Sequence, residues 1–178
     1  MDVARPTGSD CVKDSRGVAV ADFDGDGRLD LVINNNNETP ALYLNNLRKT
    51  GHAVELKLVG GPGSNRDAVG ACVRLTAGGK TMTRYVEAGS GYASQSMLPV
   101  HFGLGGAEAV EAVEVCWPSG LVQRIEGESL RAALGVNRLV RIEEGRDPSQ
   151  TASAARPLAR TSVAADASAR AGSAGSMP

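Results

Sequence analysis

Short runs in which apolar and polar residues alternate make up most of the first 145 residues, and Gly, Asn or Pro stands between most of these runs. Alternation with a period of two places successive side chains on opposite faces of a β-strand, and the residues between the runs favour turns. One stretch, residues 127–137, has the spacing of a helix instead. The alternating pattern predicts strands over residues 17–23, 29–34, 41–46, 52–60, 70–77, 81–89, 99–105, 110–118, 121–127 and 137–144.

Two of the predicted strands show which of their faces is buried. Val73 and Leu75 share one face of the first strand, and Val113 and Val115 share one face of the second. Residues 77–80, with two adjacent glycines, are typical of a tight hairpin turn whose backbone needs positive φ. Half-buried antiparallel strands of this kind predict a small all-β domain, either an antiparallel β-sandwich or a partly open barrel.

Four carboxylates lie within nine positions between the first two predicted strands. They belong to Asp22, Asp24, Asp26 and Asp30, and two glycines interleave them. Without a partner the four charges would repel one another, and Arg28 can neutralise only one of them. A hard divalent cation accepts six to eight oxygen ligands and suits Asp. The stretch therefore predicts a calcium site formed by the four carboxylates and the Arg28 carbonyl.

The same spacing begins an EF-hand loop, so the flanking residues decide between two kinds of calcium site. An EF-hand needs Glu at the twelfth position of the loop and a helix on either side. Here the twelfth position is Ile33, and both flanks alternate as strands do. The pattern favours a strand–loop–strand calcium site. An alternative without metal, in which the loop is only a solvated hairpin, would need one or two such residues and not four.

Composition narrows the possible functions. The chain has 178 residues, of which 42% are hydrophobic, so it can bury one moderate core or two small ones. A formal net charge of -1 and an aromatic content of 3% argue against nucleic acid as a partner. No apolar run approaches the length of a membrane span, and the first residues lack the pattern of a signal peptide.

From residue 146 the composition changes to Ala, Ser, Arg and Pro. No period of 2 or 3.6 in this stretch would bury an apolar face. Residues 146–178 are therefore expected to be a disordered, solvated tail, and we assign no function to it.

The three cysteines do not form a metal or redox motif. Cys11, Cys72 and Cys116 lie far apart in the sequence, and no two form a CxxC pair. Cys72 and Cys116 fall on the polar faces of two predicted strands. They could be cross-strand neighbours, which would permit a disulfide in an oxidising compartment, whereas Cys11 is expected to be free.

A second group of candidate residues lies around the Gly- and Ser-rich stretch 89–96. Tyr92, Gln95 and His101 could present one aromatic ring and several hydrogen-bonding groups to a ligand. The plainer interpretation is that the stretch caps its own backbone and that His101 packs within a strand. No nucleophile motif encloses the serines, so catalysis is not expected. Trp117 precedes a Pro and a Gly that turn the chain, and we expect it to pack in the core or at a domain interface.

These segments together carry a resemblance to two known families. Residues 17–46 resemble one FG-GAP (VCBS-type) repeat, the calcium-loop unit of integrin-like β-propellers. Residues 51–145 resemble the ASPIC/UnbV domain that follows such repeats in cartilage acidic protein-like proteins, and they contain SNRDAVGA, GSGYASQ, HFGLG and WPSG in the expected order. The resemblance implies an extracellular or periplasmic, calcium-bound protein concerned with adhesion or assembly. It implies no catalytic residue.

The expected organisation has three parts. Residues 1–48 would form the calcium-loop repeat, residues 49–145 the β-domain, and residues 146–178 the tail. A propeller needs several blades, so the single repeat favours a chain taken from the C-terminal end of a longer protein. The alternative is a lone blade packed on the β-domain.

The sequence thus predicts a calcium-stabilised, non-catalytic module for binding, adhesion or assembly. Its partner would be an unidentified protein or carbohydrate surface, together with any upstream blades. Two alternatives remain open: a purely structural cap of a propeller, and an accessory carbohydrate-binding or hydrolytic domain that uses residues 89–96.

Overall fold

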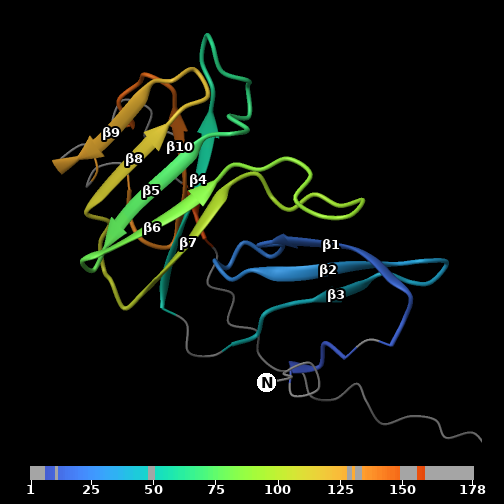
Figure 1. Ribbon diagram of the computed structural model, residues 1–178. Coiled ribbons are helices and arrows are strands. Elements are labelled where there is room, and N and C mark those ends of the chain that lie inside the picture. Colours follow the sequence, from blue (N-terminus) through green and yellow to red (C-terminus); the bar gives the residue numbers. More distant parts are fainter. Residues whose placement is uncertain are drawn as a thin grey trace, which may run out of the picture.

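The fold is all-β, as predicted. The computed structural model describes residues 7–10, 12–47, 51–127, 130, 134–148 and 156–158, and this part of the chain contains eleven strands and no regular helix (Figure 1). Among these described residues there is no helix long and apolar enough to cross a membrane. The strands are β1 (Ser15–Ala21), β2 (Asp30–Asn35), β3 (Ala41–Tyr43), β4 (His52–Val59), β5 (Cys72–Ala77), β6 (Lys80–Tyr85), β7 (Val100–Gly105), β8 (Ala112–Cys116), β9 (Val122–Glu126), β10 (Arg138–Glu143) and β11 (Arg156–Pro157).

The first three strands form a small antiparallel sheet, which we call the repeat (residues 15–47). The strand order is β1-β2-β3, and Ala21 pairs with Asp30 where the loop between β1 and β2 leaves the sheet. The loop therefore starts at Asp22 and ends at Leu29. Because both flanking strands are in register, the loop ends are held together and its carboxylates are crowded at one end of the sheet.

The described residues from 51 to 148, together with Arg156–Pro157, form the β-domain, in which two four-stranded sheets enclose one core. One sheet has the order β11-β10-β4-β7 and the other the order β6-β5-β8-β9 (Figure 1). Alternate residues of both sheets are fully buried, among them Leu56, Leu75, Phe102 and Val113. Burying each such side chain contributes about 1.5–3 kcal/mol. Among the described residues the sheets do not close into a barrel, so the sandwich is the better of the two predicted descriptions.

One pairing differs from the antiparallel expectation. β10 runs parallel to β4, with Leu139 opposite Glu55, whereas β7 runs antiparallel to β4 on its other side. A parallel pair needs a long connection between its strands, and here β5 to β9 separate β4 from β10. The sheet that contains β4 is therefore mixed.

The hairpin between β5 and β6 has the predicted geometry. Ala77 pairs with Lys80, and Gly78 and Gly79 between them have φ of +55° and +69°. Positive φ at both central residues is typical of a type I′ turn, which matches the twist of the flanking strands. Trp117 is 3% exposed, and its indole N–H donates to Gln123 Oε1 over 3.0 Å, which confirms the predicted core position.

The predicted helix over residues 127–137 lies partly outside the described residues. Within it, the amide of Leu134 donates to the carbonyl of Leu130 over 2.7 Å, and both side chains are buried. Most of the predicted tail also lies outside the described residues.

The tail prediction is wrong at one point. Arg156–Pro157 form β11, which pairs antiparallel with β10, and Leu158 is 9% exposed. One leucine in an Ala- and Ser-rich segment is enough to bury apolar area against the folded part. Its amide also donates to the carbonyl of Asn137 over 3.0 Å.

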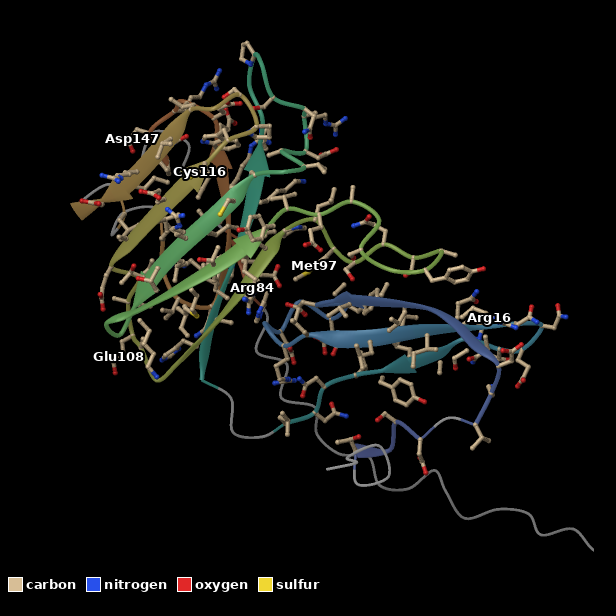
Figure 2. All side chains as sticks on the ribbon, viewed as in Figure 1. Arg16, Arg84, Met97, Glu108, Cys116 and Asp147 are labelled. Carbon is tan, nitrogen blue, oxygen red and sulfur yellow. The ribbon has the colours of Figure 1, made fainter. Side chains whose placement is uncertain are left out.

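The two cysteines of the β-domain are direct cross-strand partners, and both are free thiols in this structure. Cys72 on β5 pairs with Cys116 on β8, whose side chain is labelled in Figure 2. Antiparallel partners have Cα atoms about 4.5–5.5 Å apart, within the range of disulfides.

We predict that a mild oxidant joins Cys72 and Cys116 in a disulfide, which mass spectrometry of the unreduced protein would detect as a loss of two hydrogens. Cys116→Ser should prevent this change, and an unreduced wild-type protein without it would contradict the prediction. Cys11 lies outside the described residues.

Candidate metal centre

Asp22 organises the loop between β1 and β2. Its Oδ1 accepts hydrogen bonds from the amides of Gly25 (2.7 Å) and Asp26 (2.9 Å), and its Oδ2 accepts one from Gly27 (2.7 Å). Gly25 and Gly27 have φ of +76° and +87°, a region that side chains disfavour. The alternation of Asp and Gly therefore lets the backbone fold around the first carboxylate.

Asp30 fixes the other end of the loop. It is the first residue of β2 and is 2% exposed. Its Oδ2 accepts the amide of Phe23 (2.9 Å), and its Oδ1 accepts the amide of Asn45 (2.8 Å), which follows β3. A buried carboxylate with two charge-assisted hydrogen bonds holds the loop to the third strand.

The structure brings three of the four predicted carboxylates together. Oxygen atoms of Asp22, Asp24 and Asp30 all lie within 4.8 Å of one another. The carboxylate of Asp26 instead forms an ion pair with Arg28, whose Nε–H donates to the carbonyl of Asn45. The predicted ligand set is thus divided into three clustered carboxylates and one that Arg28 holds.

The clustered oxygens have the chemistry that calcium prefers. Carboxylate oxygens are hard ligands, and a loop that supplies several of them from alternate positions suits a cation with a large and flexible coordination shell. Asp24 is the exposed member of the cluster and makes one local hydrogen bond, to the amide of Asp26 (3.2 Å). Asp22, Asp24 and Asp30 could therefore hold a divalent cation.

The β-domain covers one side of this loop. His101 on β7 donates from Nε2 to the carbonyl of Gly27 over 2.9 Å. A Cβ placed on Gly27 would lie 3.1 Å from Leu158 Cδ1 and 3.9 Å from the Cβ of Ala53. The loop therefore packs closely against the sheet formed by β4, β7, β10 and β11.

Comparison with known proteins shows to which family the chain belongs. The family model described as ASPIC and UnbV matches residues 61–149, half of the chain, and the model described as FG-GAP repeat matches residues 16–51. The chain belongs to the ASPIC and UnbV family. Its β-domain is an ASPIC/UnbV domain, and the repeat that precedes it is an FG-GAP repeat, as the sequence motifs predicted.

Curated relatives are similar to more than half of this chain. Cartilage acidic protein 1 of Mus musculus is 37% identical over 67% of this chain and 19% of the relative. The proteins of the same name from Xenopus tropicalis and Homo sapiens are each 38% identical, over 61% and 58% of this chain and 17% and 16% of the relatives. The matched part spans less than a fifth of the length of these relatives.

The ASPIC/UnbV domain contributes a buried acid beside the loop. Glu55 on β4 is 5% exposed, and its Oε1 has no hydrogen-bond partner. It shares a cavity of about 210 Å³ with the loop residues 22–25 and with Leu139, Pro157 and Leu158. Sequence analysis did not single out Glu55. The only sequence feature that pointed to Glu55 was a single acid between the apolar Val54 and Leu56. The same alternation is typical of a strand with one solvated face.

Burial changes the protonation of two acids around this cavity. Desolvation, together with a smaller effect of the nearby charge of Asp22, raises the pKa of Glu55 to about 7. Desolvation also raises the pKa of Asp22, although hydrogen bonds from the amides of Gly27 and Gly25 oppose this effect. Without a cation, both carboxyl groups therefore bind protons more readily than exposed ones.

We predict that the metal-free protein loses stability as the pH rises. The unfolded chain titrates Glu55 near 4.5 and the folded chain near 7, so the folded state holds more protons between these values. The free energy of unfolding therefore falls through this window, by at most about 3 kcal/mol. Urea unfolding in a chelator at about pH 5 and about pH 8 measures the difference. Glu55→Gln should remove most of it, and an unchanged pH dependence in that variant would contradict the assignment.

The second group of predicted residues does not meet at one place. The Tyr92 side chain is 77% exposed on the loop between β6 and β7. The amide of Gln95 is used within that loop, since its Nε2 donates to the carbonyls of Glu87 (3.1 Å) and Ser96 (2.8 Å) and its Oε1 accepts the amide of Gly89. His101 contacts the backbone of the loop between β1 and β2, as described above. His101 also lines a cavity of about 230 Å³ between the two domains.

The same loop also connects the ASPIC/UnbV domain to the FG-GAP repeat. The amide of Met97, labelled in Figure 2, donates to the carbonyl of Val20 (3.0 Å), and the amide of Val20 donates to Ser96 Oγ (3.2 Å). A Cβ on Gly17 would lie 3.2 Å from the carbonyl oxygen of Tyr92. Residues 86–99 therefore act as a structural contact along β1.

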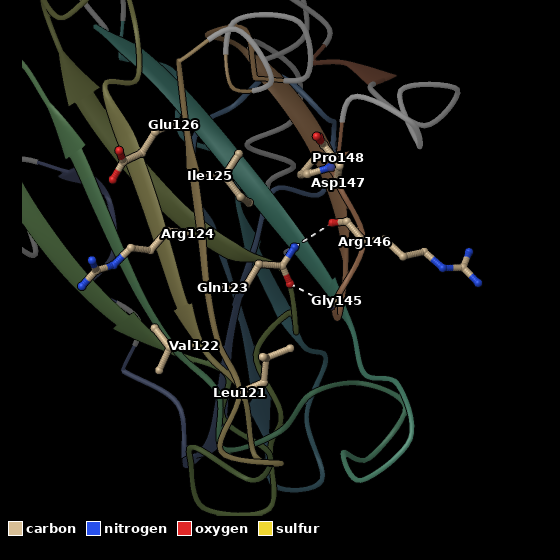
Figure 3. A pocket seen from close by; sticks show the side chains of 10 residues that line it. All are labelled: Leu121, Val122, Gln123, Arg124, Ile125, Glu126, Gly145, Arg146, Asp147 and Pro148. Carbon is tan, nitrogen blue, oxygen red and sulfur yellow. Dashed lines mark hydrogen bonds between the residues drawn. The ribbon is translucent and has the colours of Figure 1, made fainter.

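A larger surface cavity, of about 300 Å³, lies beside β9 (Figure 3). Its side chains come from residues 121–126 and 145–148. The Gln123 side chain joins β9 to residues 145 and 146 across this cavity. Its Nε2 donates to the carbonyl of Arg146 (2.7 Å), and its Oε1 accepts the amide of Gly145 (3.0 Å). This amide is also the partner of Trp117, so its polar groups hold the fold together.

Proposed function

We propose that this chain is a calcium-stabilised, non-catalytic module of an extracellular or periplasmic protein that acts in binding, adhesion or assembly. The observation that carries the proposal is the cluster of Asp22, Asp24 and Asp30 in the loop of an FG-GAP repeat. The ion would be structural: it would neutralise carboxylates that otherwise repel one another and so order the loop. The name of the relatives, cartilage acidic protein, supports a role outside the cell.

The histidines support a role without catalysis. His101 donates to the Gly27 carbonyl, and the ring of His52 is hydrogen-bonded through Nδ1 to Asn137 (3.0 Å). A general base must reach a reacting group, and both rings are occupied by structural contacts. The partner we propose is a protein or carbohydrate surface.

A second candidate function is that of a structural cap for a β-propeller. Two hydrogen bonds favour it, one donated by Met97 to the carbonyl of Val20 and one donated by the amide of Val20 to Ser96 Oγ, because they fix the ASPIC/UnbV domain along an FG-GAP sheet. Exposed apolar side chains on or near the repeat, including Val18, Leu42 and Leu44, would suit neighbouring blades. Calcium stabilisation is common to both candidates.

Terbium luminescence and calcium titration test the proposed metal site. We expect saturable calcium binding with a dissociation constant on the order of 10⁻⁴ to 10⁻³ M and poor replacement by magnesium, which demands tighter octahedral geometry. Asp24→Ala should abolish binding, whereas Asp67→Ala, which removes an exposed acid of the ASPIC/UnbV domain, should not. An intact chain that shows no saturable binding at about ten times the upper value would overturn the proposal.

A further inference from the structure

Glu55 occupies a position where a solvated side chain would be expected. On β4, Val54, Leu56 and Leu58 face the core between the two sheets, so Glu55 faces the opposite side together with Ala53 and Lys57. Lys57 on that face is exposed, but Ala53 and Glu55 are 6% and 5% exposed. Part of the outer face of β4 is therefore covered.

The cover is the calcium loop. Glu55 pairs with His101 on β7 and with Leu139 on β10, so these three side chains form one row across the sheet. The His101 ring donates to the carbonyl of Gly27, and Leu139 lines the same cavity as Asp22 and Asp24. One row of the ASPIC/UnbV domain thus faces the carboxylates of the FG-GAP repeat.

The carboxyl group of Glu55 lacks what a buried acid needs. Its Oε1 is inaccessible to solvent and accepts no hydrogen bond in the structure. Leaving such a group without a partner costs about 1–3 kcal/mol, and more when it is charged. The cavity beside it has room for more than one water molecule and is lined by two further carboxylates, those of Asp22 and Asp24. Glu55 is not among the carboxylates that lie within 4.8 Å of one another, but it faces Asp22 and Asp24 across this cavity, where a cation held by the loop could also take it as a partner.

We propose that Glu55 is an additional carboxylate of the calcium site, supplied by the ASPIC/UnbV domain, so that the cation clamps the FG-GAP repeat onto this domain. This inference rests on the calcium site proposed above and extends it from a loop to an interface between two domains. The sheet position of Glu55 is rigid because β4 is paired on both sides. Binding of the ion would therefore reduce the relative motion of the two parts as well as order the loop.

Calcium titration of the intact chain carrying Glu55→Gln tests the inference. We expect the dissociation constant for calcium to rise about 10- to 100-fold, as for other residues that support a metal from outside its loop. Glu55→Asp, which keeps the charge, should lose less affinity. Glu126→Gln is the matched control, because it removes the same charge from an exposed position on β9 and should change affinity less than about twofold.

Amide exchange supplies a readout of the clamp itself. In the wild-type protein, calcium should slow exchange both in the loop and along β4 and β7, whereas in Glu55→Gln the effect should be confined to the loop at calcium concentrations that saturate it. If Glu55→Gln binds calcium with wild-type affinity while Asp24→Ala loses binding, the proposed role of Glu55 is wrong. The proposed calcium site in the loop would still hold. No binding by the wild-type protein would overturn both.

Discussion

Asp30→Ala is expected to lower the free energy of unfolding of the FG-GAP repeat by roughly 2–6 kcal/mol even in the absence of calcium. The carboxylate is 2% exposed and accepts the amides of Phe23 and Asn45. Its removal leaves two part-buried amide donors without this partner, and each can cost up to about 3 kcal/mol. Calcium binding should disappear as well, since Asp30 is one of the three clustered carboxylates.

Asp24→Ala is the matched comparison for this prediction. Asp24 belongs to the same cluster but is exposed and accepts one local hydrogen bond. We expect it to lose calcium binding while changing the calcium-free stability of the repeat by less than about 1 kcal/mol. Chemical denaturation followed by amide exchange in β1 to β3 measures both. Equal calcium-free losses in the two variants would contradict the structural role assigned to Asp30.

Phe102→Ala is expected to lower the free energy of unfolding of the ASPIC/UnbV domain by about 3–5 kcal/mol. The ring is fully buried between the two sheets, and its removal combines lost transfer free energy with a residual cavity. Phe102 is next to His101 but faces the opposite side of β7, so the loop between β1 and β2 keeps its contact with His101. In the folded variant, calcium affinity should therefore stay within a few-fold of the wild-type value.

Tyr92→Ala provides the control for the loss of an aromatic ring. Tyr92 is 77% exposed, and its truncation should cost less than about 0.5 kcal/mol. Urea unfolding monitored by the fluorescence of Trp117, which is buried in the domain, separates the two variants. A loss below about 1 kcal/mol in Phe102→Ala would show that the two sheets do not share the core described here.

Local sequence was sufficient where local contacts determine the structure. The alternation around Val73 and Leu75 predicted the buried face of β5, and Gly78 and Gly79 predicted its hairpin. The Asp and Gly spacing predicted a loop between two strands, since that spacing alone sets which amides can reach the first carboxylate. These features depend on neighbours fewer than ten residues away.

Features that depend on distant segments could not be predicted. The sequence around Glu55 describes a strand with one polar face, and only the docking of the repeat turns that face into a buried one. The parallel pairing of β4 with β10 joins residues more than 80 positions apart. In the sequence, Leu158 is an isolated leucine in a polar tail. Only the structure shows that it packs next to Gly27.

The different partners of the four aspartates could not be predicted from the sequence either. The spacing predicted the same ligand role for Asp26 as for Asp22 and Asp24. In the structure, however, the Asp26 side chain forms an ion pair with Arg28, two residues later. From the sequence, Arg28 was expected only to supply a charge too small for four carboxylates and a carbonyl ligand. The direction in which its guanidinium turns depends on the Asn45 carbonyl, which follows the third strand.

Thermal and chemical unfolding of the intact chain, in chelator and in calcium, tests whether the Asp22 loop is a stabilising metal site. Calcium at about 100 times its dissociation constant should add about 2.7 kcal/mol to the free energy of unfolding of the repeat. It should also slow amide exchange across residues 22–30, and Asp24→Ala should abolish both effects. If saturating calcium leaves the unfolding transition and the exchange of this loop unchanged in the wild-type chain, the loop is not a calcium site in this protein.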